Sequence, residues 1–437
     1  MSGREAGTRE AGNGAEPGAA AASHAAGIAP EVLEEVAAEI GTPAYVYDGR
    51  ALDAGVRRWT EAVPPEDILY SVKANSNLSV LRRLASHGIG LEAGTWGEYA
   101  RARRSGVPSD RVTLGGVPKD ETTVRSVLKA GVGLAVFQAE GEVEAAARHA
   151  DPGRPTPAGV RVLPGIRAGA HPSLETGAAD AKFGFAPDEV PAVWRRLAET
   201  PGLEPTTLAV HLGSGLDDAA PYVTALDLLL DVAGELGGHG PAVRALDVGG
   251  GLGVDYEAGD AEGDPDPGEL ARRLRRRMEE RAGEEAPRLR FEPGRSVCAR
   301  AGVVLTRVQY GRERGGRPAL VCDAGYSDFP RHVLYGAHHD IGPIRGEGRG
   351  PADVAVLGPT CESGDVLGVG RSLHGVEADD LLVVRDAGAY GFVMASNYNS
   401  RPRPPEVLVD GDDWRPIRDR ESLDDLWRGE TKHLLDD

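Results

Sequence analysis

The sequence predicts an α/β protein in which a (β/α)8 TIM barrel is followed by a β-rich second region. Three observations predict this fold. Eight short apolar runs recur between residues 68 and 294, helical apolar spacing appears between them, and helical spacing becomes scarce after about residue 295. Alternating strand and helix signals are typical of βαβ units in a parallel sheet. Eight such units over roughly 245 residues match a closed barrel, although an open, doubly wound sheet remains the alternative.

Each predicted strand is a short apolar run bounded by glycine or polar residues. The eight runs are Ile68–Lys73, Gly90–Gly94, Val112–Gly116, Leu134–Gln138, Gly159–Ile166, Leu208–Gly213, Ala245–Gly251 and Leu289–Gly294. Between them, segments such as Leu78–His87 and Ala220–Leu236 repeat apolar residues with the spacing of one helix face. These segments are therefore predicted to be the helices that cover the barrel.

The region after residue 295 has β-like runs separated by Gly, Pro and Asp turns. The runs are Gly302–Tyr310, Arg317–Asp323, Asp353–Leu357, Asp380–Arg385 and Pro405–Val409. Residues 311–317 are predicted to be a hairpin loop, 338–352 a longer surface loop, and Glu421–Trp427 a short closing helix. We expect residues 46–294 to form the barrel, and residues 29–45 and 295–437 to form a second, β-rich domain.

Composition and charge limit the function classes. The 437 residues are 41% apolar and 27% charged, as in an ordinary soluble protein. The net charge of -19 argues against a nucleic-acid partner. Residues 1–28 lack the apolar surface to fold and are predicted to be a disordered tail. No run approaches the roughly 18–20 apolar residues of a membrane helix, and no signal peptide is recognisable.

The three cysteines, Cys298, Cys322 and Cys361, are far apart in the sequence. None belongs to a C-x-x-C pair, so neither a zinc site nor a disulfide framework is predicted. A low, odd number of cysteines fits a reducing cytoplasm. We therefore expect a cytoplasmic protein without a metal centre.

Polar and glycine-rich residues gather at the predicted carboxyl ends of four strands, where barrel proteins carry their chemistry. These ends are Lys73, His211–Gly215, Gly249–Gly253 and Glu292–Arg295. A lysine at a strand end is usually a surface residue whose stem lies along apolar neighbours. A buried lysine at a barrel mouth has a lowered pKa, which makes its amine available for a covalent bond to an aldehyde.

The other three ends also have an ordinary and a functional interpretation. Gly249–Gly253 is either a tight turn or a cradle of backbone N–H groups for a phosphate, to which Ser214 adds a hydroxyl. His211 is either a core histidine or a flat surface that stacks on a cofactor ring. Glu292 is either a solvated charge or a carboxylate that keeps a pyridine nitrogen protonated. Taken together, the functional interpretations predict a site for pyridoxal 5′-phosphate.

From about Gly41 to its C-terminus the chain resembles the diaminopimelate decarboxylases, which are pyridoxal-phosphate enzymes of the alanine-racemase-like type (fold type III). The similarity rests on motifs that agree in order and spacing. Residues 70–75 are similar to the family's Y-A-V-K-A-N, with Ser71 in place of Ala, and residues 292–295 match E-P-G-R. The remaining matches are residues 161–164 with R-I-N-P, 182–184 with K-F-G, 211–214 with H-x-G-S, 249–253 with G-G-G-x-G, 331–335 with R-P-x-L-Y, 361–365 with the C-E-S-G-D segment and 388–390 with G-A-Y.

The resemblance implies a role for each matching position. Lys73 would bind the cofactor covalently, His211 would stack on its ring and Glu292 would pair with the ring nitrogen. Cofactor binding would be completed by Ser214, Gly250, Gly251, Gly294, Arg295 and Tyr390. The far end of the substrate would bind Arg295, Arg331, Tyr335, Glu362 and Tyr390.

The resemblance also implies a homodimer with shared active sites, because the family's Cys-Glu segment reaches across the dimer interface. By the same resemblance, Cys361 of the partner subunit, or Lys73, would protonate the substrate carbon. The expected catalytic residues are Lys73, Cys361, Glu292 and His211. Glu92 and Trp96 depart from the family's usual D-V-x-S-G-G-E and lie near Lys73, where they are expected to reshape the pocket.

Three functions remain open. The first is decarboxylation of meso-2,6-diaminopimelate to L-lysine and CO2, which the retained substrate-binding residues favour. The second is decarboxylation of another amino acid, diamino or carrier-bound, in a secondary-metabolite pathway, which the departures at Glu92 and Trp96 favour. The third is a non-catalytic pyridoxal-phosphate-binding protein, against which the retention of Lys73 and Cys361 counts.

Overall fold

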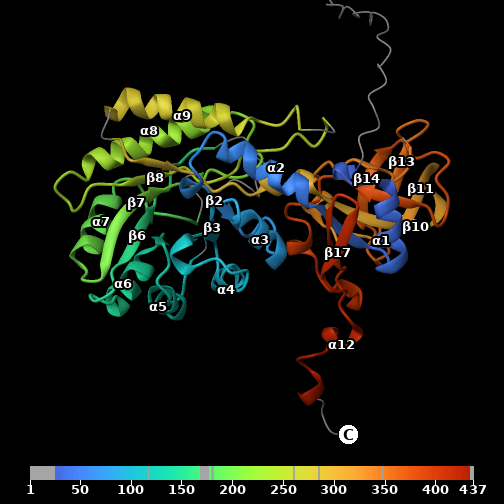
Figure 1. The fold of residues 1–437 in the computed structure, drawn as a ribbon, viewed down its shortest axis with the longest axis horizontal. Coiled ribbons are helices and arrows are strands. Elements are labelled where there is room, and N and C mark those ends of the chain that lie inside the picture. The colour runs from blue at the N-terminus through green and yellow to red at the C-terminus, as the bar shows by residue number, and fades with distance from the viewer. Residues whose placement is uncertain are drawn as a thin grey trace, which may run out of the picture.

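A computed structural model describes residues 25–116, 118–167, 177–178, 182–258, 261–283, 286–346 and 348–433. It contains two β-sheet bodies that lie side by side (Figure 1). One is an eight-stranded parallel sheet surrounded by helices, and the other is a nine-stranded mixed sheet. In the described part of the chain, no helix is long and apolar enough to cross a membrane.

The eight strands of the first sheet follow one another in chain order and close into a barrel. They are β2 (Leu69–Ser71), β3 (Gly90–Ala93), β4 (Val112–Leu114), β5 (Leu134–Phe137), β6 (Thr156–Arg161), β7 (Leu203–Ala209), β8 (Ala245–Asp247) and β9 (Arg288–Arg290). A parallel bridge between Ile68 and Phe291 joins the last strand to the first. Each predicted strand overlaps one of these strands, so the barrel prediction is confirmed and the open sheet is excluded.

Helices cover the outside of the barrel (Figure 1). They are α2 (Gly49–Thr60), α3 (Leu78–Ala85), α4 (Trp96–Arg104), α5 (Glu121–Ala130), α6 (Glu140–His149), α7 (Val190–Glu199), α8 (Ala220–Glu235) and α9 (Pro267–Ala282). In α3 the side chain of Asn77 caps the N-terminus, and Val80, Leu81 and Leu84 are buried on one face. Helices α3 and α8 match the two segments that helical spacing singles out.

The glycine-rich strand ends lie in loops rather than in the strands themselves. The predicted runs continue to Gly213 and Gly251, whereas β7 ends at Ala209 and β8 at Asp247. Gly213 and Gly249 have φ values of 146° and 74°, which extended L-residues rarely adopt. The chain therefore leaves the sheet before its functional residues, and these residues lie in loops above the barrel.

The second sheet combines the N-terminal strand with the C-terminal third of the chain. Its strands are β1 (Ala44–Asp48), β10 (Gly302–Arg314), β11 (Arg317–Cys322), β12 (Ile341–Pro343), β13 (Val354–Leu357), β14 (Val366–Arg371), β15 (Leu381–Val384), β16 (Glu406–Asp410) and β17 (Asp413–Arg418). Helix α1 (Pro30–Glu39) packs against it, and Val36 is fully buried there. Strand β1 pairs with β10 and β16, so it belongs to the second sheet. Residues 46–48 therefore lie in the second sheet, whereas the sequence predicts that the barrel begins at residue 46. Residues 1–24 of the predicted tail lie outside the described residues, and Ile28 is buried.

Two loop predictions in this region are only partly right. A hairpin does lie within residues 311–317, but its loop consists only of Gly315 and Gly316, because β10 and β11 continue to the turn. The predicted surface loop 338–352 contains β12, which pairs with β15, and its His339 is buried. Short helices α10 (Arg295–Cys298) and α11 (Arg331–Tyr335) also occur, and α12 (Leu423–Leu426) confirms the predicted closing helix.

Candidate active site

A cavity of about 300 Å³ lies at the carboxyl ends of the barrel strands. Its wall combines barrel loops with residues from the second region, including α11 and the segment around residue 390. The predicted site residues on this wall are Lys73, His211, Ser214, Arg295, Arg331, Tyr335 and Tyr390. Residues far apart in the sequence therefore converge as the motifs predict.

Lys73 follows β2 and lies beside a buried carboxylate. Its Nζ is 4.0 Å from Oε2 of Glu92, which also accepts a hydrogen bond of 3.2 Å from the Ser71 hydroxyl. Burial lowers the pKa of Lys73, but attraction to Glu92, Tyr390 and Glu292 outweighs burial, and the net pKa is raised. The expected lowering by burial alone is therefore wrong for this environment. Glu92 lies beside Lys73 as expected, but it is buried and is not among the residues that line the cavity.

Two glycine loops beside Lys73 present unused backbone donors. Among the described residues, the N–H groups of Gly213, Ser214 and Gly251 donate no hydrogen bond. Gly250 is fixed at both ends, because its N–H donates to Nδ1 of His211 and its carbonyl accepts from the Tyr222 hydroxyl. Neighbouring free N–H groups in a glycine-rich turn form an anion-binding concavity.

The carboxyl group of Glu292 lies in an environment that disfavours its negative charge. Burial raises its pKa well above the usual value, and Asp247 and Glu92 raise it further. Asp247 is itself buried, and its Oδ2 atom has no hydrogen-bond partner among the described residues. A cationic partner for Glu292 would relieve this crowding.

His211 is neutral in this site. Burial lowers its pKa well below the usual value, and the charges of Lys73 and Arg161 lower it further. Its Nδ1 accepts the hydrogen bond from Gly250, so the ring is held as a flat wall of the cavity.

Two buried arginines on the cavity wall have no acidic partner in the described part of the chain. Arg295 and Arg331 are only 5% and 4% exposed, and neither forms an ion pair with a carboxylate among the described residues. Arg295 donates to Oγ of Ser214 and to the hydroxyl of Tyr256, each at 2.8 Å. A buried guanidinium group without a counter-charge is costly, so the pair indicates a place for an anion.

Other predicted residues lie away from this cavity. Cys361 and Glu362 are exposed beyond it: Cys361 accepts a hydrogen bond from Asn399, and Glu362 accepts one from Tyr398. Trp96 stacks on Tyr99 at 4.6 Å and is not among the residues that line the cavity, although its neighbour Thr95 is. Gly294 lies directly behind the wall, since a Cβ atom added there would be 3.5 Å from the Tyr390 hydroxyl.

Comparison with known proteins identifies the family. Residues 50–299 match the family described as pyridoxal-dependent decarboxylase, pyridoxal binding domain. The chain is 40% identical over 402 residues to the diaminopimelate decarboxylase of Pseudomonas aeruginosa, which covers 91% of this chain and 95% of that protein. The chain belongs to the diaminopimelate decarboxylase family.

Other members of the diaminopimelate decarboxylase family agree with this assignment. The enzyme of Archaeoglobus fulgidus is 37% identical over 398 residues, covering 90% of this chain and 94% of its own. The crystal structure of the Helicobacter pylori diaminopimelate decarboxylase complexed with L-lysine matches with a TM-score of 0.85 and 32% identity, covering 92% of this chain and 100% of that one.

The residues present fit pyridoxal phosphate, the cofactor of the family. Lys73 presents an amine for the aldehyde, and the free N–H groups of the glycine loops suit the phosphate. The raised pKa of Glu292, caused first by burial, suits a partner that carries a proton on its ring nitrogen.

Several residues of this site are not among the predicted site residues. Arg161, Phe183 and Glu98 line the cavity, and the first two lie in motifs whose letters alone indicate no role. Tyr256 and His339 contact the two arginines from loops. Neither loop has a strand-end pattern, so no sequence signal pointed to them.

Proposed function

We propose that this protein decarboxylates meso-2,6-diaminopimelate to L-lysine. The observation that carries the proposal is the pair of buried arginines, Arg295 and Arg331, on the cavity that holds Lys73. Diaminopimelate keeps a carboxylate at the end away from the reacting carbon, and two guanidinium groups suit that anion. Ornithine, arginine and lysine have a single carboxylate, so when it is placed at the reacting carbon no anion is left for the far end. The names of the most similar relatives support the same substrate.

We assign cofactor binding to residues of this chain. Lys73 binds the aldehyde carbon, His211 stacks on the ring, and Glu292 pairs with the ring nitrogen. The phosphate is bound by Ser214, Gly250, Gly251 and Tyr390, with Gly294 and Arg295 beside them. When bound, the cofactor would supply an aldehyde for the amine and a ring that draws electrons away from the reacting carbon.

The remaining residues orient the substrate and move protons. Arg295, Arg331, Tyr335 and Tyr390 hold the distal carboxylate and thereby fix which end of the substrate reacts. Glu92 holds the protonated Nζ of Lys73 within the cavity, so a proton is available at that nitrogen for the substrate carbon. Cys361 and Glu362 of a second subunit complete the site, with Cys361 as the second proton donor.

A CO2-release screen of purified protein loaded with pyridoxal phosphate tests the substrate. We expect release from meso-diaminopimelate, with an equal amount of lysine, and little release from lysine, ornithine, arginine or glutamate. Release from one of the other free amino acids instead would establish the second function. Binding of the cofactor without turnover of any of them would shift weight to a carrier-bound substrate or a binding role.

The proposed homodimer explains the position of Cys361 and Glu362. Both are exposed on their own subunit, outside its cavity. Helix α11 carries the exposed apolar residues Val333 and Leu334 directly beside the site residue Tyr335, as an interface would. A location in the cytoplasm is part of the same proposal, and the free Cys298, Cys322 and Cys361 support it.

Mixing two inactive variants tests whether the dimer shares its sites. Lys73→Ala and Cys361→Ala are each expected to be strongly impaired alone. After reversible dissociation and mixing, about a quarter of the wild-type site number is expected to return, because one of the two sites in each mixed dimer is intact. A mixture no more active than its parents would show that Lys73 and Cys361 act within one subunit or that Cys361 has no role.

A further inference from the structure

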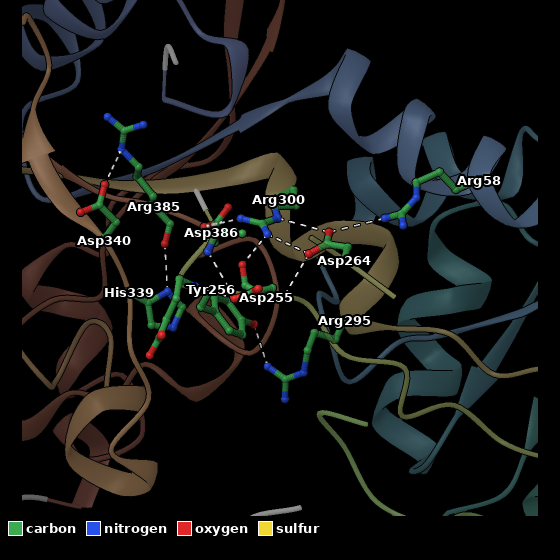
Figure 2. Close-up of polar contacts among 12 residues, drawn as sticks. Arg58, Asp255, Tyr256, Asp264, Arg295, Arg300, His339, Asp340, Arg385 and Asp386 are labelled. Atoms are coloured by element: carbon green, nitrogen blue, oxygen red, sulfur yellow. Dashed lines mark hydrogen bonds and ion pairs between the residues drawn. The ribbon is translucent and has the colours of Figure 1, made fainter. Parts of the chain in front are cut away.

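Tyr256 lies between the two arginines that we assign to the substrate. It is in the loop that follows β8, and its hydroxyl accepts a hydrogen bond of 2.8 Å from Nη1 of Arg295 (Figure 2). The guanidinium carbon of Arg331 lies 5.3 Å from the centre of the same ring. One aromatic side chain therefore touches both cations, and a cation placed over an aromatic face is attracted to it.

His339 also contacts Arg331. It is fully buried, and its Nε2 accepts a hydrogen bond of 3.0 Å from Nε of Arg331. Its Nδ1 is 2.9 Å from the carbonyl oxygen of Arg385, which can only accept, so Nδ1 carries the proton (Figure 2). The His339 and Tyr256 rings are in contact, with their centroids 4.6 Å apart.

The loop that carries Tyr256 is fixed to the segment that carries Arg295. Arg300, in the 3-10 turn Ala299–Ala301 just after α10, donates to both oxygens of Asp264 and to the backbone carbonyl of Asp255. Arg300 also pairs with Asp386 at 3.0 Å, and Arg58 of α2 reaches Asp264 from the barrel side (Figure 2). These contacts fix the position of Tyr256 relative to Arg295.

Neutral partners leave the arginines available for a ligand. Only the Nε atom of Arg331 is used by His339, and among the described residues its two terminal nitrogens donate no hydrogen bond. Those nitrogens form the edge of the guanidinium that binds a carboxylate in a bidentate manner. A carboxylate in place of His339 would neutralise the charge, whereas a neutral imidazole positions it and preserves it.

We propose that Tyr256 and His339 are positioning residues that set the specificity for a carboxylate at the far end of the substrate. The inference rests on the proposed function and deepens it, because it explains how the two arginines keep their spacing without an acidic partner. Neither residue is expected to touch the reacting carbon.

Two ligands that differ only in the carboxylate test this role. L-lysine carries it, and 1,5-diaminopentane is the same molecule without it. Binding of each to the pyridoxal-phosphate-loaded enzyme is measured by calorimetry for the wild type, His339→Leu, His339→Gln and Tyr256→Phe. His338→Leu is the matched control, because His338 is the adjacent but exposed histidine.

For His339→Leu we expect the affinity for L-lysine to fall about 10-fold while the affinity for diaminopentane stays within about twofold. His339→Gln keeps an acceptor for Arg331 and a donor for the Arg385 carbonyl, so it should recover most of the loss. Tyr256→Phe removes only the hydroxyl that Arg295 uses and should weaken L-lysine binding about threefold. In steady-state assays these variants should raise KM for meso-diaminopimelate more than they lower kcat.

The outcomes separate this inference from the proposed function. The positioning role is overturned if the variants bind both ligands equally more weakly than the wild type. It is also overturned if neither His339→Leu nor Tyr256→Phe lowers the affinity for L-lysine. The substrate assignment stands in both cases. A wild-type enzyme that does not prefer L-lysine over diaminopentane overturns the assignment of the distal carboxylate, and the positioning role falls with it. Tyr256→Phe differs from the wild type by one oxygen atom, so it gives a result even if His339→Leu does not fold.

Discussion

Replacing Lys73 with alanine is expected to lower kcat by at least about 10⁴-fold, because the side chain both anchors the cofactor and supplies a proton. Its Nζ is the amine that lies on the cavity wall beside Glu92, 4.0 Å from that carboxylate. The visible absorbance band that covalently bound pyridoxal phosphate gives should disappear in the same variant. Turnover assays and an absorbance spectrum of the purified protein measure both effects.

Two further variants distinguish loss of the Lys73 amine from loss of its positive charge and from a general effect of removing a lysine. Lys73→Arg keeps a positive charge beside Glu92 but cannot form the covalent bond, so it should also lack the absorbance band. Lys129→Ala removes an exposed lysine on α5 and should behave as the wild type. A normal absorbance band in Lys73→Ala would mean that another amine binds the cofactor.

The sequence predicts the barrel well because each of its units carries a local signal. Short apolar runs and amphipathic helices such as α3 can be recognised without knowledge of the tertiary fold. The wrong predictions arise where pairing between strands decides the structure. Residues 311–314 are polar, but pairing across the hairpin with the adjacent strand β11 extends β10 through them. Strand β12 pairs with β15, which lies much later in the chain, so local spacing does not reveal this pairing.

In the candidate site, too, the residues with a local sequence signal are predicted and the residues without one are not. Lys73, His211 and Arg295 lie at strand ends with recognisable motifs, and the structure brings them to one cavity. Tyr256 and His339 lie in loops, and the contacts of Tyr256 with Arg331 and His339 join the loop after β8 to the C-terminal region. The sequence pattern predicts the wrong direction for the pKa of Lys73, because it indicates burial but does not show that the charge of Glu92 lies beside the amine.

Glu292→Gln is expected to lower kcat roughly 10³-fold while leaving the cofactor bound. An amide has nearly the same shape as the carboxyl group, but it carries no negative charge to keep a ring nitrogen protonated. Kinetic assays with saturating pyridoxal phosphate measure the loss, and Glu279→Gln, an exposed glutamate on α9, is the matched control. Activity within about tenfold of the wild type would remove Glu292 from the catalytic set.

The same substitution should stabilise the cofactor-free protein at neutral pH. Burial raises the pKa of Glu292 well above its usual value of 4.5, and Asp247 and Glu92 add to the shift. A carboxyl group whose pKa is higher in the folded state contributes its full stabilisation below pH 4.5, where it is protonated in both states. This stabilisation is lost as the pH rises from 4.5 through the folded-state pKa.

Glutamine does not ionise, so the free energy of unfolding of Glu292→Gln should fall less steeply with pH above 4.5 than that of the wild type. Urea denaturation of both cofactor-free proteins at several pH values measures the two slopes. Identical slopes would show that Glu292 ionises as easily in the folded chain as in the unfolded one. We therefore expect a variant that is less active but more stable. This result would mean that the carboxyl group of Glu292 destabilises the fold and is retained because it pairs with the ring nitrogen of the cofactor.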